Sequence, residues 1–414
     1  MFDIMSLKNQ EDKMFDDYDY KNTSTRIKLK FIQKRDEPMY PWEIAGFLNK
    51  LNTVYYKFEL LNSICSAIEH GIPPEDIFIF DHSLPLYKRY SQMNLLSEPN
   101  AAKTFYPIGM PIPLIPSKYI YEFNCFYKAF HIINSTLRKT HVQPFRTQTV
   151  ASAFEVLQTE GLTAAEDYII NLAIARADKS YESAVKRGEK KNKPDHGIFE
   201  KSLEKYRKNK EYIFSSLDII LTLSDDQKST IISPTHKGDK RLKSMLTAFF
   251  TSFDTTTRPL VCARIGNNNI RILGRSLVNK EEQTGLELKE IKRNSPLGAL
   301  IEGGAALYQA INQEKRAKEL HELEKKKKEE EIKLIQTQIH GEELKNFETE
   351  IKIAQTLQTI EATTDINAIR NIPDSPMKRQ IEKAYSTEYA HAGRVLTEQG
   401  LTLQRNSISI DTNA

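Results

Sequence analysis

The chain has 414 residues, of which 59 are Lys or Arg and 55 are Asp or Glu, so its formal charge is only +4. With 39% hydrophobic and 28% charged residues, the composition excludes collagen-like, wholly disordered, disulfide-rich and membrane-embedded classes, and the length allows two or three domains. A charge this small over this length does not by itself indicate a nucleic acid or an acidic partner.

The number of cysteines and the hydropathy of the chain indicate the cellular location of the protein. Cys65, Cys125 and Cys262 are far apart and form no CxxC pair, so the sequence predicts neither a zinc site nor a disulfide framework. No stretch approaches the roughly 20 apolar residues of a membrane-spanning helix, and the N-terminus lacks the pattern of a signal peptide. We therefore expect a cytoplasmic protein without a metal or cofactor and without membrane insertion.

The N-terminal part of the chain mixes strand and helix patterns. Residues 1–22 are polar and predict a flexible leader, whereas Arg26–Phe31 alternates polar and apolar side chains like a half-buried strand. Apolar residues spaced by three and four predict a long helix from Trp42 to about His70, and Ile77–Phe80 has strand character. Residues 84–118 predict loops, and their proline-rich part, 107–116, is either a buried cover for the core or an exposed recognition strip.

The middle of the chain is predicted to be helical and then to form strands. Tyr119–Leu137 has no decisive periodicity and is either a strand or a short aromatic helix. Residues 147–223 read as helices, with Thr163 and Glu166 in the positions of a capping box and 163–223 as a helical hairpin. Three strand-like pieces follow, the first two flanking a Gly-Asn turn: Leu260–Ile265, Ile270–Leu273 and Leu286–Ile291.

A long charged helix is expected to begin near Pro296 and to run to about Gln358, with its small-residue start packed inside the globular body. Eight charged residues lie between Leu323 and Ile332, and several Glu-to-Lys pairs four residues apart stabilise such a helix. The apolar residues before and after these eight charged residues have heptad-like spacing, but the two sets do not share one heptad frame. The segment is therefore either a solvated connecting helix or a partial coiled coil that mediates self-association. A final helix, from about Asp374 to Gln399, precedes an edge strand or tail.

Together these patterns predict an α+β fold that is mainly helical, with a small antiparallel or mixed sheet, a helical hairpin insertion and a long charged C-terminal helical arm. The expected regions are a flexible leader (1–22), an N-terminal α+β region (23–146), the helical hairpin insertion (147–235), a β-hairpin-containing region (236–296), the long charged helix (297–363) and a C-terminal helix with its tail (364–414).

No phosphate-binding glycine loop, nucleophile elbow, zinc-protease motif or dinucleotide fingerprint is present in the sequence. Residues 186–210 instead hold ten Lys or Arg and four acidic residues, interleaved with Phe199 and Tyr206. Cations that track phosphates and aromatic rings that stack on bases make this pattern a candidate nucleic-acid surface, although a solvated hairpin face is the alternative. The candidate binding residues are Lys186, Arg187, Lys190, Lys191, Lys205, Arg207, Lys208, Lys210, Arg264 and Arg271.

Two weaker patterns suggest catalysis. Asp81 and His82 follow the apolar Ile77–Phe80 run, but neighbours in an extended chain point to opposite faces, so we expect a local turn rather than a site. Arg316 and His321 have an Arg-x4-His spacing, which resembles the motif of the HEPN ribonucleases; the family's Arg commonly precedes a polar residue, whereas Ala317 stands here. The resemblance implies an RNase or toxin-type effector in which Arg stabilises phosphate charge and His transfers a proton.

The leading hypothesis from the sequence is a non-catalytic, self-associating interaction or scaffold protein that acts through residues 297–363, as a homo-oligomer or with a protein partner. The alternative is a nucleic-acid-binding protein that uses the basic hairpin, and the HEPN-like effector comes third.

Overall fold

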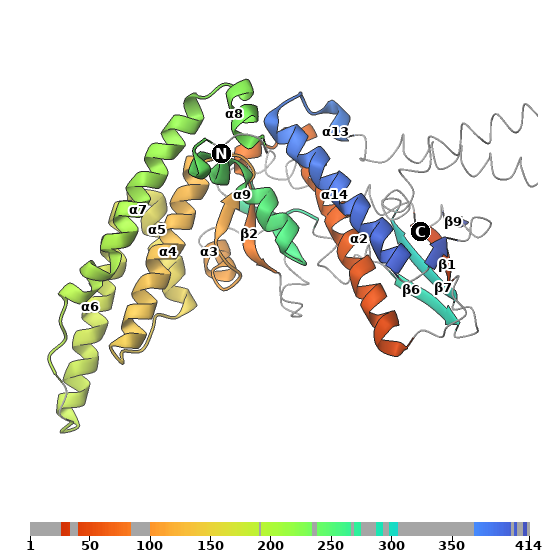
Figure 1. Ribbon diagram of the computed structural model, residues 1–414. Helices are drawn as coiled ribbons and strands as arrows, with labels where there is room; N and C mark the ends of the chain where they lie inside the picture. The colour runs from red at the N-terminus through yellow and green to blue at the C-terminus, as the bar shows by residue number, and fades with distance from the viewer. Residues whose placement is uncertain are drawn as a thin grey trace, which may run out of the picture. The chain divides into compact units, whose positions relative to one another are not determined.

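The computed structural model describes residues 26–33, 40–83, 100–189, 192–233, 238–265, 269–274, 287–292, 298–304, 368–398, 401–403 and 409–411. The described helices and strands confirm the predicted α+β, mainly helical fold. The chain divides into two compact units: unit 1 holds residues 1–70, 274–374 and 378–414, and unit 2 holds residues 71–273 with 375–377 (Figure 1).

Unit 1 contains an antiparallel sheet whose strands come from distant parts of the sequence. Its order is β6-β7-β1-β8, and β9 also pairs with β1. Leu29 lies opposite Ile301 on β7, and Phe31 lies opposite Leu403 on β8. The strand bounds are β1 (Arg26–Gln33), β6 (Glu287–Lys292), β7 (Gly298–Gly304), β8 (Leu401–Leu403) and β9 (Ser409–Asp411).

The helices of unit 1 are α2 (Pro41–Glu69), the short α13 (Ala368–Asn371) and α14 (Pro376–Glu398). Pro41 at the first helical position and Glu43, whose side chain accepts a hydrogen bond from the Tyr40 amide, explain why α2 begins where it does. Phe58 of α2 packs against Tyr385 and Tyr389 of α14, with ring centroids 5.6 and 4.6 Å apart. The sequence predicted both long helices correctly.

Unit 2 contains a second antiparallel sheet with the order β3-β2-β4-β5. The register of β2 against β4 shifts between Ile79 and Ser83, so the strand is irregular where it ends. The strand bounds are β2 (Ile77–Ser83), β3 (Pro111–Pro113), β4 (Pro259–Ile265) and β5 (Asn269–Ile272).

Helices make up most of unit 2. The aromatic segment after the prolines is helix α4, whose Phe123, Phe126 and Phe130 are buried, with Phe154 of α5 packed against the first two. Large rings of this kind bury about 150–250 Å² each and supply much of the core. The bounds are the 3-10 helix η1 (Pro74–Asp76), α3 (Asn100–Phe105), α4 (Lys118–Lys139), α5 (Thr147–Glu160), α6 (Leu162–Lys186), α7 (Gly197–Thr222), α8 (Asp225–Ile232) and α9 (Lys240–Thr255).

Three sequence predictions about the fold are wrong. Residues 84–118 were predicted to be loops, but helix α3 and the edge strand β3 lie in this range. Residues 298–304 form strand β7 rather than the start of a long helix, because this glycine-rich piece is a poor helix former and pairs with β1 and β6. The strands also do not share one sheet, since β4 and β5 belong to unit 2 whereas β1 and β6 belong to unit 1. The remainder of the predicted arm, residues 305–363, lies outside the described residues.

Candidate functional site: the α6–α7 pair and its outer face

A buried carboxylate lies between α4, α6 and α7. The sequence assigned Glu166 to a capping box with Thr163, but α6 begins one residue earlier, at Leu162, and no side chain caps it. Glu166 instead belongs to the inward face of α6, with Ala165, Ile169 and Ile170, and only 1% of it is exposed. The capping prediction is therefore wrong, because the Glu166 side chain forms hydrogen bonds to another helix instead of to the start of α6.

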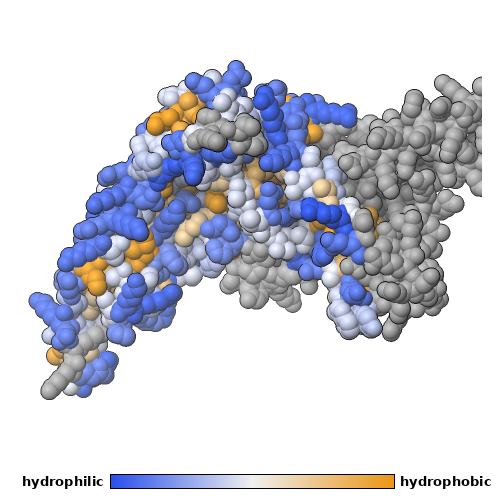
Figure 2. All heavy atoms as spheres, in the orientation of Figure 1, coloured by the Kyte–Doolittle hydropathy of each residue, from blue (hydrophilic) through white to orange (hydrophobic). Residues whose placement is uncertain are grey.

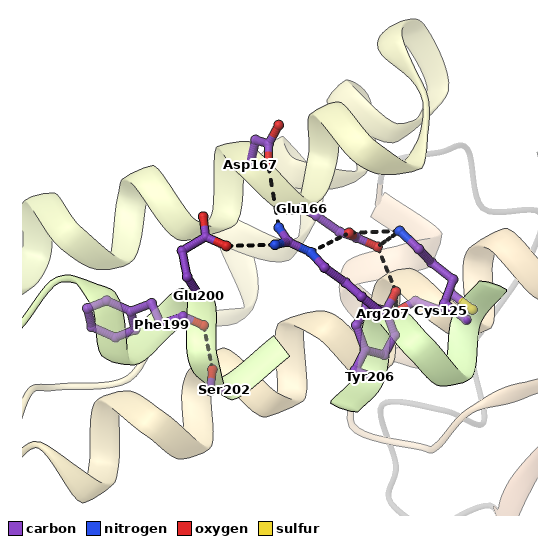
Figure 3. A network of polar contacts seen from close by, with 9 residues as sticks. Cys125, Glu166, Asp167, Phe199, Glu200, Ser202, Tyr206 and Arg207 are labelled. Carbon is purple, nitrogen blue, oxygen red and sulfur yellow. Dashed lines mark hydrogen bonds and ion pairs between the residues drawn. The ribbon is translucent and has the colours of Figure 1, made fainter. Parts of the chain in front are cut away.

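Glu166 is the centre of a polar network that joins three helices (Figure 3). The Lys210 ammonium donates to both carboxylate oxygens at 2.7 and 2.9 Å, and the Tyr206 hydroxyl lies 2.8 Å from Oε1. That hydroxyl is also 3.0 Å from the Cys125 carbonyl oxygen of α4. Arg207 approaches Glu166 at 3.8 Å and pairs with Glu200 at 2.7 Å. Each buried charge thus has an opposite charge or a hydrogen-bond donor beside it.

The protonation states fit a structural role for this network. Burial, reinforced by Cys125 and Glu166, raises the pKa of Tyr206 far above its ordinary value, so the hydroxyl stays protonated and donates. Burial also raises the pKa of the Cys125 thiol to about 11. Two of the predicted nucleic-acid-binding residues, Arg207 and Lys210, are therefore held in internal contacts with acidic side chains.

The other predicted basic residues divide into exposed and engaged groups. Arg264 pairs with Asp76 at 2.6 Å and lies over the Tyr119 ring, whereas Arg271 is buried in β5. Arg264 lies opposite Ile270 and Arg271 lies opposite Ala263 in the register of β4 and β5, so the two arginines face opposite sides of the sheet. Lys186, Lys205 and Lys208 are exposed, and Arg187 is exposed but pairs with Glu189 at 2.7 Å. Lys190 and Lys191 lie outside the described residues.

The outward side of α7 carries a basic row that ends at an aromatic ring. Lys201, Lys205 and Lys208 are exposed and have no ion pair with any described residue, and Tyr212 follows in line and is 50% exposed. Arg241 of α9 lies over this ring, 3.2 Å from its centroid, and donates to Asn209 at 2.9 Å. The structure thus places Arg241 of α9 beside the basic row of α7, which is about thirty residues away in the sequence.

The end of α7 and the following α8 form an apolar corner on the surface of unit 2, and Figure 2 shows hydrophobic residues gathered at this end of α7. Ile219 and Leu221 are 51% and 57% exposed. No residue of α8 is buried, although the helix is held by a capping box at Ser224. We call the exposed or partly exposed aliphatic residues of this stretch the apolar corner: Ile219, Leu221, Leu223, Ile231 and Ile232.

Asp81 and His82 converge, contrary to the sequence expectation. His82 Nδ1 lies 2.6 Å from Asp81 Oδ1, and the same oxygen accepts a hydrogen bond from the Met110 amide at 2.8 Å. The irregular end of β2 removes the strict alternation on which the expectation rested. Gly109 passes so close that a Cβ there would lie 2.2 Å from Asp81 Oδ1, so the pair is packed against backbone.

Unit 1 has its own buried ion pair between α2 and α14. Lys57 and Glu388 are both buried, with Nζ and Oε1 3.5 Å apart, and His391 Nδ1 lies 3.4 Å from the other carboxylate oxygen. Burial raises the pKa of the Glu388 carboxyl, and Lys57 and His391 oppose the shift. Nearby, burial raises the pKa of the Cys65 thiol to about 12. This pair links two helices that are more than three hundred residues apart.

The remaining candidates give no site within the described residues. Arg316 and His321, the HEPN-like pair, lie outside them. Among the residues that the structure does describe, no group of three His, Cys, Asp or Glu side chains could hold a metal ion. No helix of this part of the chain is long and apolar enough to cross a membrane.

Comparison of this chain with protein-family models, with curated proteins and with solved structures finds no match in any of the three.

The buried network of Glu166 was not predicted from the sequence, although the sequence contains one signal of it. Glu166 interrupts an apolar stripe of α6 at helical spacing, and Tyr206 and Lys210 are one turn apart on α7. A lone carboxylate inside such a stripe requires a buried partner, which the neighbouring helix supplies.

Proposed function

We propose that the protein is a non-catalytic interaction protein that associates with itself. In this proposal the charged segment 305–363 of one copy binds the apolar corner of unit 2 on another copy. The observation that carries the proposal is the corner itself, in which Ile219 and Leu221 at the end of α7 are about half exposed and the following helix, α8, has no buried residue. Clustered exposed apolar side chains are typical of protein-binding surfaces.

Covering the corner contributes a useful but limited free energy. Full burial of a Leu or Ile side chain is worth about 1.5–3 kcal/mol. Ile219 and Leu221 are each about half exposed, so covering both contributes about 1.5–3 kcal/mol. This is enough to select a partner but leaves the association dependent on charge as well.

Charge complementarity favours the segment as the occupant. Asp218 lies between Ile219 and Leu221 around α7, at about 100° per residue, and the exposed Asp225 and Asp226 open α8. The segment carries the opposite charge in Lys325–Lys328, which precede the acidic Glu329–Glu331 and then the apolar Ile332 and Ile335. The basic run matches the acidic rim of the corner, and the aliphatic residues beyond it match the aliphatic side chains of the corner.

The test is the molar mass of the full chain in solution, measured by light scattering after size-exclusion chromatography. Leu221→Glu places a charge in the corner and is expected to reduce the oligomer to monomer. Val185→Glu is the matched control, because Val185 is equally exposed, at 51%, but lies on α6 outside the corner. A wild-type monomer, or equal masses for the two variants, contradicts the proposal.

We also propose a cytoplasmic location. It is supported by the three cysteines, which are all unpaired and buried thiols.

A further inference from the structure

We infer that the outer face of α7 binds single-stranded nucleic acid through a cationic strip made of Lys201, Lys205, Lys208 and Arg241, with Tyr212 as a ring on which a base stacks. This site goes beyond the proposed self-association, because it uses none of the residues of the apolar corner.

The spacing of the strip follows from helix geometry. At about 100° per residue, Lys201, Lys205, Lys208 and Tyr212 fall within about 60° of one another around α7, so they form a single line. With a rise of about 1.5 Å per residue, the line is about 16 Å long. Because successive phosphates of one strand are about 3.4 Å apart along a duplex axis and farther apart in an extended single strand, this length spans at most four to five nucleotides.

The lysines of the strip are available to an external anion. They are exposed and make no ion pair with any described residue, whereas Arg207 and Lys210 on the opposite side of α7 are committed to Glu200 and Glu166. Hydrophilic side chains line much of the visible outer face of α7 in Figure 2. Lysines that already had carboxylate partners would have to break those pairs before they bound phosphate.

Among the described residues of α7, the acidic side chains beside the strip lie on one flank. Glu204 and Glu211 are exposed on that flank, at more negative angles around the helix. On the other flank lies α9, which brings Arg241 to Asn209. A nucleic-acid strand that follows the lysines along this side therefore reaches another cation, Arg241, at Tyr212.

Tyr212 is the feature that favours a single strand over a duplex. The Arg241 guanidinium, 3.2 Å from the ring centroid, fixes one side of the ring, while half of the side chain remains exposed. An exposed ring beside a row of cations is the arrangement by which proteins stack an unpaired base while binding the backbone. A paired base in a duplex does not offer its face to such a ring.

The experiment measures binding of a fluorescent single strand of about 12 nucleotides to the full chain, at about 50 and about 200 mM salt. A strip variant with Lys201→Glu, Lys205→Glu and Lys208→Glu is compared with a control variant of equal charge change at exposed lysines elsewhere, Lys118→Glu, Lys139→Glu and Lys179→Glu. We expect the strip variant to bind much more weakly and its salt slope to fall by about 2, and the control to resemble the wild type. Equal binding by the two variants, or no binding by the wild type, overturns the inference.

A second comparison isolates the ring. Tyr212→Ala is expected to weaken single-strand binding about five- to hundredfold, and Tyr212→Phe to retain it, with little change in the salt slope. Duplex binding equal to single-strand binding, unaffected by Tyr212→Ala, identifies a general polyanion surface and refutes the single-strand assignment. Oligomeric mass is measured on the same variants. It stays at the wild-type value if the strip is independent of the corner, so failure of one proposal is distinguishable from failure of the other.

Discussion

Replacing the buried Glu166 by Gln tests the account of the α6–α7 pair most sharply. The glutamine is nearly the same size and its oxygen still accepts from Tyr206, but the negative charge beside Lys210 is lost. Lys210 is only 15% exposed and its ammonium donates to both oxygens of Glu166, at 2.7 and 2.9 Å. The variant therefore leaves a largely buried cation without its main counterion.

The structure sets the size of the effect. Removing one partner of a buried ion pair costs about 3–5 kcal/mol, because the remaining charge stays desolvated. Lys210 keeps some access to water, so we expect the lower end, about 3 kcal/mol. That corresponds to an increase of about a hundredfold in the local opening equilibrium of α6 and α7.

Hydrogen exchange measured by mass spectrometry reports this opening for each helix separately, which suits a chain with two units. Glu182→Gln, at an exposed position on the same helix, is the control and is expected to change stability by less than about 0.5 kcal/mol. Adding Lys210→Met to Glu166→Gln removes the unpaired cation and is expected to recover most of the protection. Unchanged exchange in Glu166→Gln, or a double variant that is less protected than the single one, refutes the reasoning.

Three further outcomes are expected. Gly109→Ala destabilises unit 2 by more than about 1 kcal/mol, because the new Cβ meets Asp81 at a positive φ, whereas Gly46→Ala in open space on α2 stabilises by about 0.5–1 kcal/mol; urea unfolding compares them. In unit 1, the raised pKa of Glu388 means that the folded state holds a proton that the unfolded state has lost, so stability falls as pH rises above about 4.5. Glu388→Gln removes this dependence, and unfolding midpoints that do not change with pH in the wild type contradict it. Native protein does not react with a thiol reagent until it unfolds, because burial raises the pKa of every thiol: Cys65, Cys125 and Cys262.

Local patterns predicted the elements that they alone determine. The spacing of apolar residues placed α2, and the Asp-Ser-Pro sequence placed the start of α14, because helix periodicity and capping are properties of neighbouring residues. Residues 298–304 were predicted wrongly for the same reason. Their preference for a strand comes from pairing with β1, which lies almost three hundred residues earlier in the chain.

The candidate sites show the same limit. The exposed lysines of α7 could be recognised from composition, but composition did not separate Lys208, which is exposed, from Lys210, which pairs with Glu166. That distinction depends on which side of α7 packs on α4 and α6. The contact of Arg241 with Tyr212 joins helices that no sequence spacing relates, so it required the structure.

The central claim, self-association through charge-complementary surfaces, is tested most directly by a charge swap followed by light scattering. Reversing Lys325–Lys328 to Glu, or Asp218 and Asp226 to Lys, is expected to give a monomer in each case. Combining the two sets is expected to restore the wild-type oligomer, because the attraction is rebuilt with the signs exchanged. Recovery of the oligomeric mass in the combined variant supports the account, and a combined variant that remains monomeric while correctly folded contradicts it.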